Sequence, residues 1–312
     1  MNSVSEYSNK NSASPSVYIV VLNFNDYEDT CRCIRSLEEI DYPRYSIVIV
    51  DNASPDNSGE KLKDTFPMHA VIITDYNGGY AYGNNIGIQF ALSQKADFVF
   101  ILNNDTIVSR DTVNALLQPF STIPNLGMTT CKILYERTNK QYASAGTINS
   151  LLYAVVPLNN IDHERETTVS YIAGCAMMVR RSVFEKVGFL NERFFMYFED
   201  VEYSLRVGKN FTLLYTPKSI VYHKSGGGDQ WYNYTPFYYY YSARNRILTF
   251  GNTSFQKYHV IVTNMINVIM KMIVLSFYYL TGRTSSVKHQ LLALIRGFVD
   301  GVKGISDRNK LY

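Results

Sequence analysis

The first third of the chain alternates short apolar runs with longer segments of mixed polarity. Four apolar runs rich in β-branched residues cover residues 17–24, 45–50, 70–74 and 97–102. Runs of this length and composition predict buried parallel strands. The segments between them are long enough for helices, which we expect over residues 29–40, 59–66 and 80–96. This alternation of strand and helix predicts an α/β sheet flanked by helices.

Polar side chains follow each of these predicted strands at the point where it ends. The four exits read Asn23-Phe24-Asn25-Asp26, Asp51-Asn52-Ala53-Ser54, Asn77-Gly78-Gly79-Tyr80 and Asn103-Asn104-Asp105-Thr106. In open α/β sheets, ligands bind beyond the carboxyl ends of the strands. A single polar exit is explained by turns and helix caps. Four of them on one edge favour a nucleotide site, because a nucleotide needs amide and carboxylate partners as well as backbone donors.

Asp105 follows the most apolar of the predicted strands, so its carboxylate is expected at the rim of the core. A carboxylate in that place suits Mg²⁺ or Mn²⁺ bridging two phosphates, since such ions prefer one or two carboxylates together with phosphate oxygens. A helix cap for the segment that starts at Arg110 explains the same residue equally well. The local sequence leaves both interpretations open.

The loop after the third predicted strand combines glycines with three asparagines, Asn77, Asn84 and Asn85. With Gly79 and Tyr80 it stands where a strand gives way to a helix, so its backbone can approach a pyrophosphate or a sugar. The pattern is neither a Walker loop nor the G-x-G-x-x-G fingerprint. A structural turn with close helix packing is the alternative, although such a turn would not need three asparagines.

Glu199 and Asp200 come directly after the aromatic run 194–198 and begin a helix-like stretch. Apolar surroundings raise the pKa of a carboxyl group and exclude water, which suits a general base acting on a hydroxyl. Acidic residues are also favoured at a helix N-terminus because they interact well with its dipole. The two roles are compatible, with one acid for each.

His223 follows a strand-like stretch and precedes the glycine run 226–228. A lone histidine is more often a packed or surface residue than a metal ligand. In this context a neutral imidazole would complete the coordination of a metal ion held by Asp105. The glycines would then let the loop close over bound substrate.

Taken in order, these motifs closely resemble the inverting family 2 glycosyltransferases, and their bacterial rhamnosyltransferase-like branch in particular. The resemblance covers residues 17–240. Its motifs are Val50-Asp51-Asn52-Ala53-Ser54, the loop from Asn77 to Gly87, Leu102-Asn103-Asn104-Asp105, Gly174-Cys175-Ala176-Met177-Met178-Val179-Arg180-Arg181, Phe198-Glu199-Asp200 and His223. It implies a GT-A fold, a Rossmann-like mixed sheet flanked by helices. It also implies that the nucleotide binds at the first two strand exits, at Asn23 and Asp51.

The resemblance further implies a role for each motif. The metal motif D-x-D corresponds to Asn103-Asn104-Asp105, where Asn103 stands in place of a frequent aspartate and Asp105 keeps the stronger ligand. Asp105 and His223 would hold Mg²⁺ or Mn²⁺. Asp200 would be the catalytic base of a single displacement with inversion, and Glu199 would orient the acceptor hydroxyl. Further contacts to the nucleotide sugar would come from Asn77, Gly79, Tyr80, Asn84, Asn85 and Asn104.

On this resemblance, the expected reaction moves a sugar from a nucleoside diphosphate donor to a saccharide or lipid-linked acceptor in bacterial cell-surface polysaccharide synthesis. The branch points to dTDP-rhamnose as the donor. Residues 174–176 and the aromatic run would line a closed sugar pocket. A nucleotidyltransferase is the alternative enzyme, but the required basic, glycine-rich loop is missing from residues 23–29. A non-catalytic sugar-nucleotide-binding scaffold is disfavoured because Asp105 and the acidic pair are both retained.

The C-terminal third is basic and aromatic, and between Asp229 and Asp300 it contains no acidic residue. Its cations are Arg244, Arg246, Lys257, Lys271, Arg283, Lys288 and Arg296, and its aromatic residues include Trp231 and the tyrosines at 238–241. Lys271 divides two apolar runs, so neither reaches the roughly 18 uncharged residues of a spanning helix. We therefore expect peripheral helices that meet an anionic membrane surface and a lipid-linked acceptor.

Packing of these helices on the catalytic domain or on a second copy of the chain, as a homodimer, is the alternative. No RNA-binding motif accompanies the cations and the net charge is only +3, so nucleic acid is not an expected partner. The four cysteines form no C-x-x-C pair, which disfavours a disulfide framework or a zinc cluster and fits a reducing compartment.

Three regions follow from these patterns. Residues 1–16 are rich in Ser and Asn and lack an apolar signal segment, which predicts a flexible N-terminal tail. Residues 17–230 are expected to form the catalytic domain, and residues 231–312 a helical region for membrane contact or dimerisation. The expected location is cytoplasmic, at the inner face of the plasma membrane.

Overall fold

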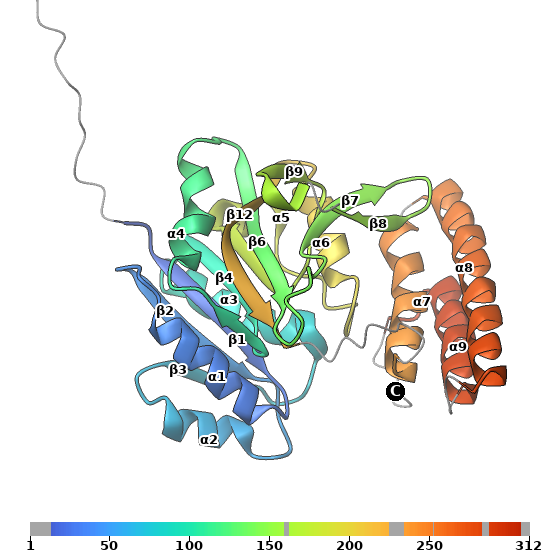
Figure 1. Cartoon of the computed structure of the whole chain (residues 1–312), viewed down its shortest axis with the longest axis horizontal. Helices are drawn as coiled ribbons and strands as arrows, with labels where there is room; N and C mark the ends of the chain where they lie inside the picture. The colour runs from blue at the N-terminus through green and yellow to red at the C-terminus, as the bar shows by residue number, and fades with distance from the viewer. Residues whose placement is uncertain (1–13, 159–161, 225–233, 252, 283–286, 307–312) are drawn as a thin grey trace, which may run out of the picture.

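The computed structural model describes residues 14–158, 162–224, 234–251, 253–282 and 287–306. These residues form a mixed sheet flanked by helices and, beside it, a group of three long helices (Figure 1). The glycine run 226–228, Trp231, Arg283 and the expected domain boundary at residue 230 lie outside the described residues.

The first half of the sheet is parallel and follows the predicted alternation. Its strands are β1 (Val17–Asn23), β2 (Tyr45–Asp51), β3 (Ala70–Ile73) and β4 (Phe98–Asn103), in the order β3-β2-β1-β4. The connecting helices are α1 (Tyr27–Glu38), α2 (Ser58–Thr65) and α3 (Gly79–Ser93). All four strands and three helices expected from the apolar pattern are confirmed, with ends that differ by at most a few residues.

The second half of the sheet runs in both directions. It contains β5 (Thr106–Val108), β6 (Leu126–Tyr135), β9 (Thr167–Val169), β11 (Ala176–Arg180) and β12 (Thr212–His223). Strand β11 lies antiparallel between β4 and β6, and β12 pairs with β6, β5 and β9. Its helices are α4 (Thr112–Leu117), α5 (Arg181–Val187) and α6 (Glu199–Val207), with short 3-10 turns η1 (Gln118–Ser121) and η2 (Asp162–Glu164).

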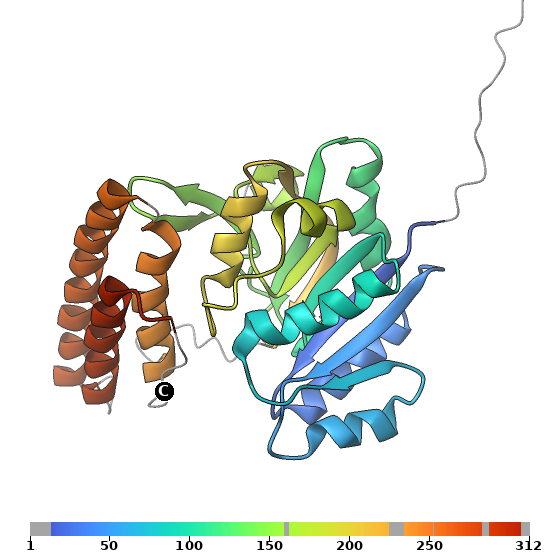
Figure 2. The same ribbon diagram turned by 180° about the vertical axis from the view of Figure 1, so that it is seen from behind.

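Two apolar cores lie on opposite faces of this sheet. Helices α1, α2 and α4 cover one face through residues such as Ile34, Leu62 and Leu116. Helices α3, α5 and α6 cover the other, which Figure 2 shows from behind. The double cover explains why the strands read as continuous apolar runs rather than alternating ones.

A second, small sheet orders as β10 (Tyr171–Ile172), β7 (Ala145–Asn149) and β8 (Ala154–Pro157). The β7–β8 hairpin extends from the main sheet to the C-terminal helices (Figure 1). At its tip the ring of Tyr153 packs 5.1 Å from Phe250 and 5.2 Å from His259. The hairpin therefore braces the helical region against the sheet domain.

The helical region consists of α7 (Pro236–Phe250), α8 (Ser254–Leu280) and α9 (Lys288–Lys303). Helices α7 and α9 pack closely at Gly297, where an added Cβ atom would come within 2.2 Å of the Tyr240 carbonyl oxygen. The expected tyrosine cluster lies inside this region, where Tyr239, Tyr240 and Tyr241 are fully buried. These tyrosines belong to the helices that were expected to meet a membrane surface, but their side chains are part of an apolar core.

The structure corrects the expectation that Lys271 separates two shorter apolar runs. Helix α8 continues through Lys271, and among the described residues it is the one helix long and apolar enough to cross a membrane by length and composition. Lys271 lies 5.9 Å from the ring centres of both Tyr238 and Tyr239, so it faces α7. Burial, assisted by the charge of Arg246, lowers the pKa of Lys271 to about 8.

The positive charge of this region is also less exposed than expected. Arg244 is fully buried, with its guanidinium 4.6 Å from the ring centre of Tyr241. Lys257, Lys288 and Arg296 remain on the surface. The predicted basic surface therefore loses Arg244 and Lys271 to internal packing.

The boundary of the expected N-terminal tail also changes. Tyr42 donates a hydrogen bond to the Pro15 carbonyl oxygen at 2.6 Å, and the Ser16 amide donates to Asp97 at 2.7 Å. Pro15 and Ser16 are thus attached to the sheet domain rather than part of a tail.

Candidate active site

A cavity of about 460 Å³ opens at the carboxyl ends of β1, β2 and β4. Its lining residues are Leu22, Phe24, Asp26, Asn52, Asn77, Gly79, Tyr80, Asn103, Asn104, Asp105, Phe195, Met196 and Phe237. Six of them are predicted site residues: Asn77, Gly79, Tyr80, Asn103, Asn104 and Asp105. The strand exits therefore converge, as their positions in a parallel sheet require.

Asn23 and Asp51 lie next to this cavity but do not line it. Both are buried, and the Asn23 amide donates to Asp51 at 2.6 Å and to the Ser58 hydroxyl at 2.9 Å. The Ser54 backbone amide donates to the other oxygen of Asp51 at 2.9 Å. These bonds tie the first two strand exits together, and the adjacent Asn52 lines the cavity with Phe24 and Asp26 of the first exit.

Asn52 connects the second exit to the third. Its amide donates at 3.0 Å to both the Asn77 side-chain oxygen and the Gly79 carbonyl oxygen. The Gly79 amide donates back to Asn77 at 2.9 Å. The asparagines of these exits thus hold the loop at the start of α3 in one conformation.

The structure places Asn84 and Asn85 away from the lining of this cavity. The Asn84 amide donates to the Tyr80 carbonyl oxygen within α3, at 2.9 Å. Asn85 is buried and bonds the backbone of Leu190 twice, as donor at 2.9 Å and as acceptor at 3.1 Å. Neither lines the cavity, because the first turns of α3 point these side chains into the packing between α3 and its neighbours.

Gly79 has a conformation that requires glycine. Its φ is +89°, and a Cβ atom there would come within 2.1 Å of the Phe195 carbonyl oxygen. That oxygen accepts a hydrogen bond from the Tyr80 amide at 2.8 Å. Gly79 therefore lets the loop before α3 approach the aromatic segment before α6.

Gly79→Ala is expected to lower stability by about 3 kcal/mol, because the left-handed φ and the overlap with Phe195 both disfavour a side chain. Thermal unfolding measures this loss. Gly282→Ala is the matched control, since Gly282 also has a positive φ of 71° but nothing lies within 4 Å of its added Cβ. Equal losses in the two variants would show that the contact with Phe195 contributes nothing.

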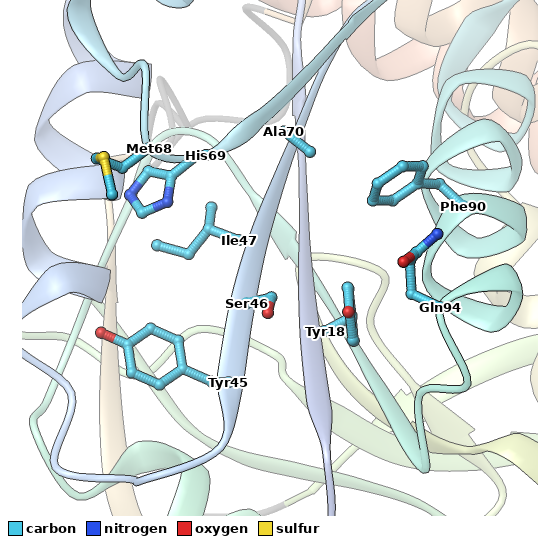
Figure 3. A pocket seen from close by; sticks show the side chains of 9 residues that line it. All are labelled: Tyr18, Tyr45, Ser46, Ile47, Met68, His69, Ala70, Phe90 and Gln94. Atoms are coloured by element: carbon cyan, nitrogen blue, oxygen red, sulfur yellow. The ribbon is translucent and has the colours of Figure 1, made fainter.

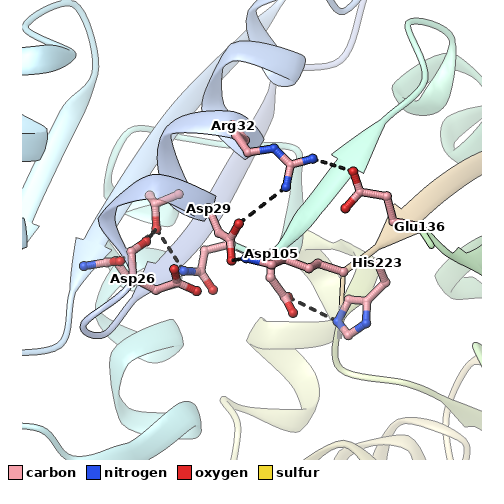
Figure 4. A network of polar contacts seen from close by, with 10 residues as sticks. Asp26, Asp29, Arg32, Asp105, Glu136 and His223 are labelled. Atoms are coloured by element: carbon pink, nitrogen blue, oxygen red, sulfur yellow. Dashed lines mark hydrogen bonds and ion pairs between the residues drawn. The ribbon is translucent and has the colours of Figure 1, made fainter. Parts of the chain in front are cut away.

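Asp105 and His223 meet at the edge of the cavity, although 118 positions separate them along the chain. Strand β12 pairs antiparallel with β5, and this register places His223 opposite Thr106. The Asp105 Oδ1 atom lies 3.2 Å from His223 Nε2 (Figure 4). Asn103 Nδ2 lies 3.3 Å from the same ring nitrogen.

This arrangement fits a divalent cation. Two ligands at neighbouring positions of an octahedral ion with bonds of about 2.1 Å lie about 3.0 Å apart, close to the separation of Asp105 and His223. The Asn103 side-chain oxygen is buried without a hydrogen-bond partner among the described residues, and it is a further oxygen donor at this point. The described residues contain no group of three or more His, Cys, Asp or Glu that could hold a metal ion.

Neighbouring side chains hold His223 in place. The ring of Tyr142 packs 4.9 Å from the imidazole. Lys224, the next residue, donates its backbone amide to the Asp105 carbonyl oxygen at 2.8 Å and pairs through its side chain with Asp29 on α1. Arg32 joins Asp29 to Glu136 in the same network (Figure 4).

The acidic pair Glu199 and Asp200 begins α6, as predicted. One oxygen of Asp200 accepts hydrogen bonds from the Tyr171 hydroxyl at 2.8 Å and from the Gly174 amide at 3.1 Å. Its other oxygen accepts from the Val201 amide at 2.8 Å. Glu199 is also buried, and its Oε2 atom has no hydrogen-bond partner among the described residues.

These contacts separate the two acids electrostatically. Burial raises the pKa of Asp200, but the hydrogen bonds from Tyr171, Gly174 and Val201 oppose this effect. Burial and then the neighbouring Asp200 charge raise the pKa of Glu199 well above its ordinary value. The hydrogen bonds therefore favour the ionised form of Asp200 over that of Glu199.

Asp200 and the cavity share a wall. Tyr80 lines the cavity and donates its hydroxyl to the Gly174 carbonyl oxygen at 2.6 Å. A Cβ atom on Gly174 would lie 3.3 Å from the Tyr80 hydroxyl and 3.5 Å from Asp200. Gly174 thus stands between the cavity residue Tyr80 and Asp200, and the small glycine keeps them close.

Sequence reasoning missed several residues of this site. Tyr171 and Tyr142 belong to no recognisable motif, and their roles depend on contacts with Asp200 and His223. Phe237 lines the cavity from α7, which we expected to be separate from the catalytic domain. Asn52 belongs to a predicted strand exit but was not itself a predicted site residue. Its position next to Asp51 was the sequence signal that could have identified it.

A second hollow of about 420 Å³ lies at the opposite end of β2 and β3 (Figure 3). It is lined by Tyr18, Tyr45, Ser46, Ile47, Met68, His69, Ala70, Phe90 and Gln94. None of the predicted site residues lines it. The predicted site residues that line the cavity at the strand exits thus lie at the other end of the sheet.

A carboxylate and an imidazole lie side by side next to a cavity at the carboxyl edge of an α/β sheet, where ligands of such sheets bind. The chain belongs to glycosyl transferase family 2, since the sequence model of that family matches residues 18–188, more than half of its 312 residues. The family confirms the resemblance inferred from the motifs.

Two relatives show the range of this similarity. The low-salt glycan biosynthesis hexosyltransferase Agl10 of Haloferax volcanii is 29% identical over 198 residues, which are 60% of this chain and 60% of the relative. The N-acetylglucosaminyl-diphospho-decaprenol L-rhamnosyltransferase of Mycobacterium tuberculosis is 29% identical over 204 residues, 57% of this chain and 66% of the relative. The chain thus spans less than two thirds of the length of these relatives.

Solved structures agree on the fold. The mannosyltransferase PcManGT from Pyrobaculum calidifontis, in complex with GDP-Man and Mn²⁺, superposes with a TM-score of 0.56 at 14% identity, over 92% of this chain and 87% of that one. The chain therefore has the GT-A fold, and the predicted fold class is confirmed.

Proposed function

We propose that the protein transfers a sugar from a nucleoside diphosphate to an acceptor hydroxyl with inversion. The observation that carries this proposal is the cavity at the strand exits, which Asp105 lines with its carboxylate 3.2 Å from His223, while Asp200 lies next to the cavity residue Tyr80, at Gly174. We assign the diphosphate to the part of the cavity next to Asp105 and the base to Asp200. Membership of the family supports the same reaction class.

Asp200 acts as the base in this reaction. It removes the proton of the acceptor hydroxyl while the hydroxyl oxygen bonds to the anomeric carbon, whose bond to the diphosphate oxygen breaks. Asp105 and His223 would hold Mg²⁺ or Mn²⁺, which supplies positive charge for the leaving diphosphate when bound. Asn52, Asn77 and Asn104 face the cavity and offer amide contacts to the nucleotide and its sugar. Glu199 is the neighbour that orients the acceptor.

We propose L-rhamnose as the transferred sugar, supplied as dTDP-rhamnose. The mycobacterial relative is an L-rhamnosyltransferase by name. A screen of sugar nucleotides by thermal stabilisation in the presence of Mn²⁺ tests the donor, and dTDP-rhamnose is expected to raise the melting temperature most because binding stabilises the folded state. A larger shift with another sugar nucleotide would reassign the donor, and no shift with any of them would contradict the function.

We propose a saccharide or lipid-linked acceptor at the inner face of the plasma membrane, in cell-surface polysaccharide synthesis. Helix α8 supports membrane contact through an exposed apolar stripe in which, from Ile266 onward, side chains recur every three or four positions. The stripe consists of Tyr258, Ile266, Ile269, Ile273, Phe277 and Leu280. The surface cations Lys257, Lys288 and Arg296 suit an anionic lipid surface.

Vesicles containing anionic lipid are expected to bind the protein in a flotation assay. The triple variant Ile266→Gln, Ile273→Gln and Phe277→Gln should reduce binding at least about tenfold, because it removes apolar area from the lipid-facing stripe. Met68→Gln is the control, since Met68 is 90% exposed but lies on the sheet domain. If the triple variant floats like the parent while remaining folded, the stripe covers another protein surface, such as a second copy of the chain.

A further inference from the structure

The segment that leads into the acidic pair has an unfavourable backbone conformation. Tyr197 and Phe198 have φ angles of 67° and 72°, so two consecutive bulky residues occupy the left-handed region. Phe198 is also the N-cap residue of α6, and its side chain makes no capping hydrogen bond. Such a conformation persists only where surrounding contacts impose it. The direction in which Glu199 and Asp200 leave this turn therefore depends on those contacts.

Asn245 of α7 supplies contacts of the required kind. Its side-chain amide donates to the Met196 carbonyl oxygen at 2.9 Å and to the Tyr197 carbonyl oxygen at 2.7 Å. Both amide protons are thus used on the strained turn. Asn245 is fully buried, so water does not replace these bonds in the folded protein.

Arg244 fixes the orientation of the Asn245 amide. The Arg244 Nε atom donates to the Asn245 side-chain oxygen at 2.8 Å, which leaves the amide nitrogen facing the turn. Its Nη2 atom reaches the Arg193 carbonyl oxygen at 3.4 Å, at the start of the same aromatic segment. Rings from α7 complete the contact, with Phe195 stacked 5.6 Å from Tyr241 and Tyr197 5.1 Å from Tyr238.

We propose that Asn245 is a positioning residue for sugar transfer, which holds the left-handed turn at Tyr197 and Phe198 and so aims Asp200 at the cavity. The inference rests on the proposed function and adds to it a role for α7. Helix α7 is then part of the catalytic unit, consistent with its Phe237 in the cavity wall. Chemistry is sensitive to such positioning, since a displacement of about 1 Å can lower turnover about 10²-fold.

The experiment compares Asn245→Ala and Asn245→Asp with Asn264→Ala. Asn264 is an equally buried asparagine of α8 that donates to the Ala243 carbonyl oxygen at 2.7 Å, within the helical region. Asn245→Asp keeps the size of the side chain and the acceptor for Arg244 but loses the donor. Both Asn245 variants are expected to lower kcat about 10- to 100-fold with donor KM changed less than about threefold, whereas Asn264→Ala keeps kcat.

Hydrogen exchange of residues 194–201 provides a readout that does not need turnover. Exchange there should rise in the Asn245 variants and stay unchanged in Asn264→Ala. Unchanged exchange in the Asn245 variants, or raised exchange with an unaltered kcat, would overturn the proposal. If the parent protein turns over no sugar nucleotide, the proposed function fails, and the positioning role fails with it. The exchange result then still decides whether Asn245 holds the turn.

Discussion

Asp200→Asn is expected to lower turnover by roughly 10³-fold, because the variant keeps the shape of the side chain but cannot accept a proton from the acceptor hydroxyl. Donor binding should persist, since the nucleotide contacts belong to the strand exits. Measured kcat with dTDP-rhamnose, together with thermal stabilisation by the donor, separates the two effects. Turnover within about tenfold of the parent would show that another group is the base.

Glu199→Gln is the matched control for this substitution. A protonated glutamic acid and a glutamine have the same shape, so the variant should keep most of its activity if Glu199 holds the shared proton at neutral pH. The rate of the parent should rise with pH through the pKa of Asp200, which burial raises, and this acid limb should survive in Glu199→Gln. Loss of activity in Glu199→Gln with retention in Asp200→Asn would exchange the two roles.

The same pair makes a contribution to stability whose sign is fixed by its pKa shift. Burial raises the pKa of Glu199, so the folded state holds this proton where the unfolded chain has released it. The contribution therefore favours folding at low pH and is lost as the pH rises above the ordinary glutamate value of about 4.5 toward the raised one. Glu199→Gln removes this slope from the free energy of unfolding.

The substitutions Asp105→Asn and His223→Ala are expected to have the second large effect on activity. Each should lower kcat/KM roughly 10²- to 10³-fold, because each removes a proposed ligand of the metal ion whose positive charge would stabilise the leaving diphosphate. Activity measured against Mn²⁺ concentration should show weaker saturation in both variants, and EDTA should abolish activity of the parent.

Glu136→Gln provides the control for the metal site. The Glu136 side chain belongs to the neighbouring ion-pair network through Arg32, and its backbone amide donates to the His223 carbonyl oxygen at 3.0 Å, a bond that the substitution keeps. Its activity should stay close to that of the parent. An EDTA-insensitive rate would contradict the metal role of Asp105, and equal losses in all three variants would assign the effect to the fold of this edge.

Local sequence was sufficient for the first half of the sheet. Strands β1, β2 and β4 are largely buried on both faces, while the edge strand β3 is partly buried, and burial on both faces leaves an apolar run that is visible without coordinates. Parallel strands also end on a common edge, so the convergence of Asn77, Asn103 and Asp105 followed from the alternation alone. The family resemblance then gave the roles of Asp200 and His223 as expectations.

Contacts between distant segments were not visible in the same way. The pairing of β5 with β12 joins Asp105 to His223, and its register depends on the whole second half of the sheet. Asn84 and Asn85 shared the composition of a ligand loop, but the helical turn of α3 directs them into packing. The residue composition of a loop and the helix after it does not determine which face of the helix each side chain will occupy.

The sequence by itself determined the α/β class, the four polar strand exits, the acidic pair and the excess of cations in the last third. Only the tertiary structure decided that Lys271 turns inward, that Arg244 is buried, and that Asn245 bonds Met196 and Tyr197. Periodicity reports which residues are apolar over a few turns, and this property is local. Which polar groups pair in the interior depends on segments that packing brings together. Helix α7 and the turn before α6 are such segments, about 50 positions apart along the chain.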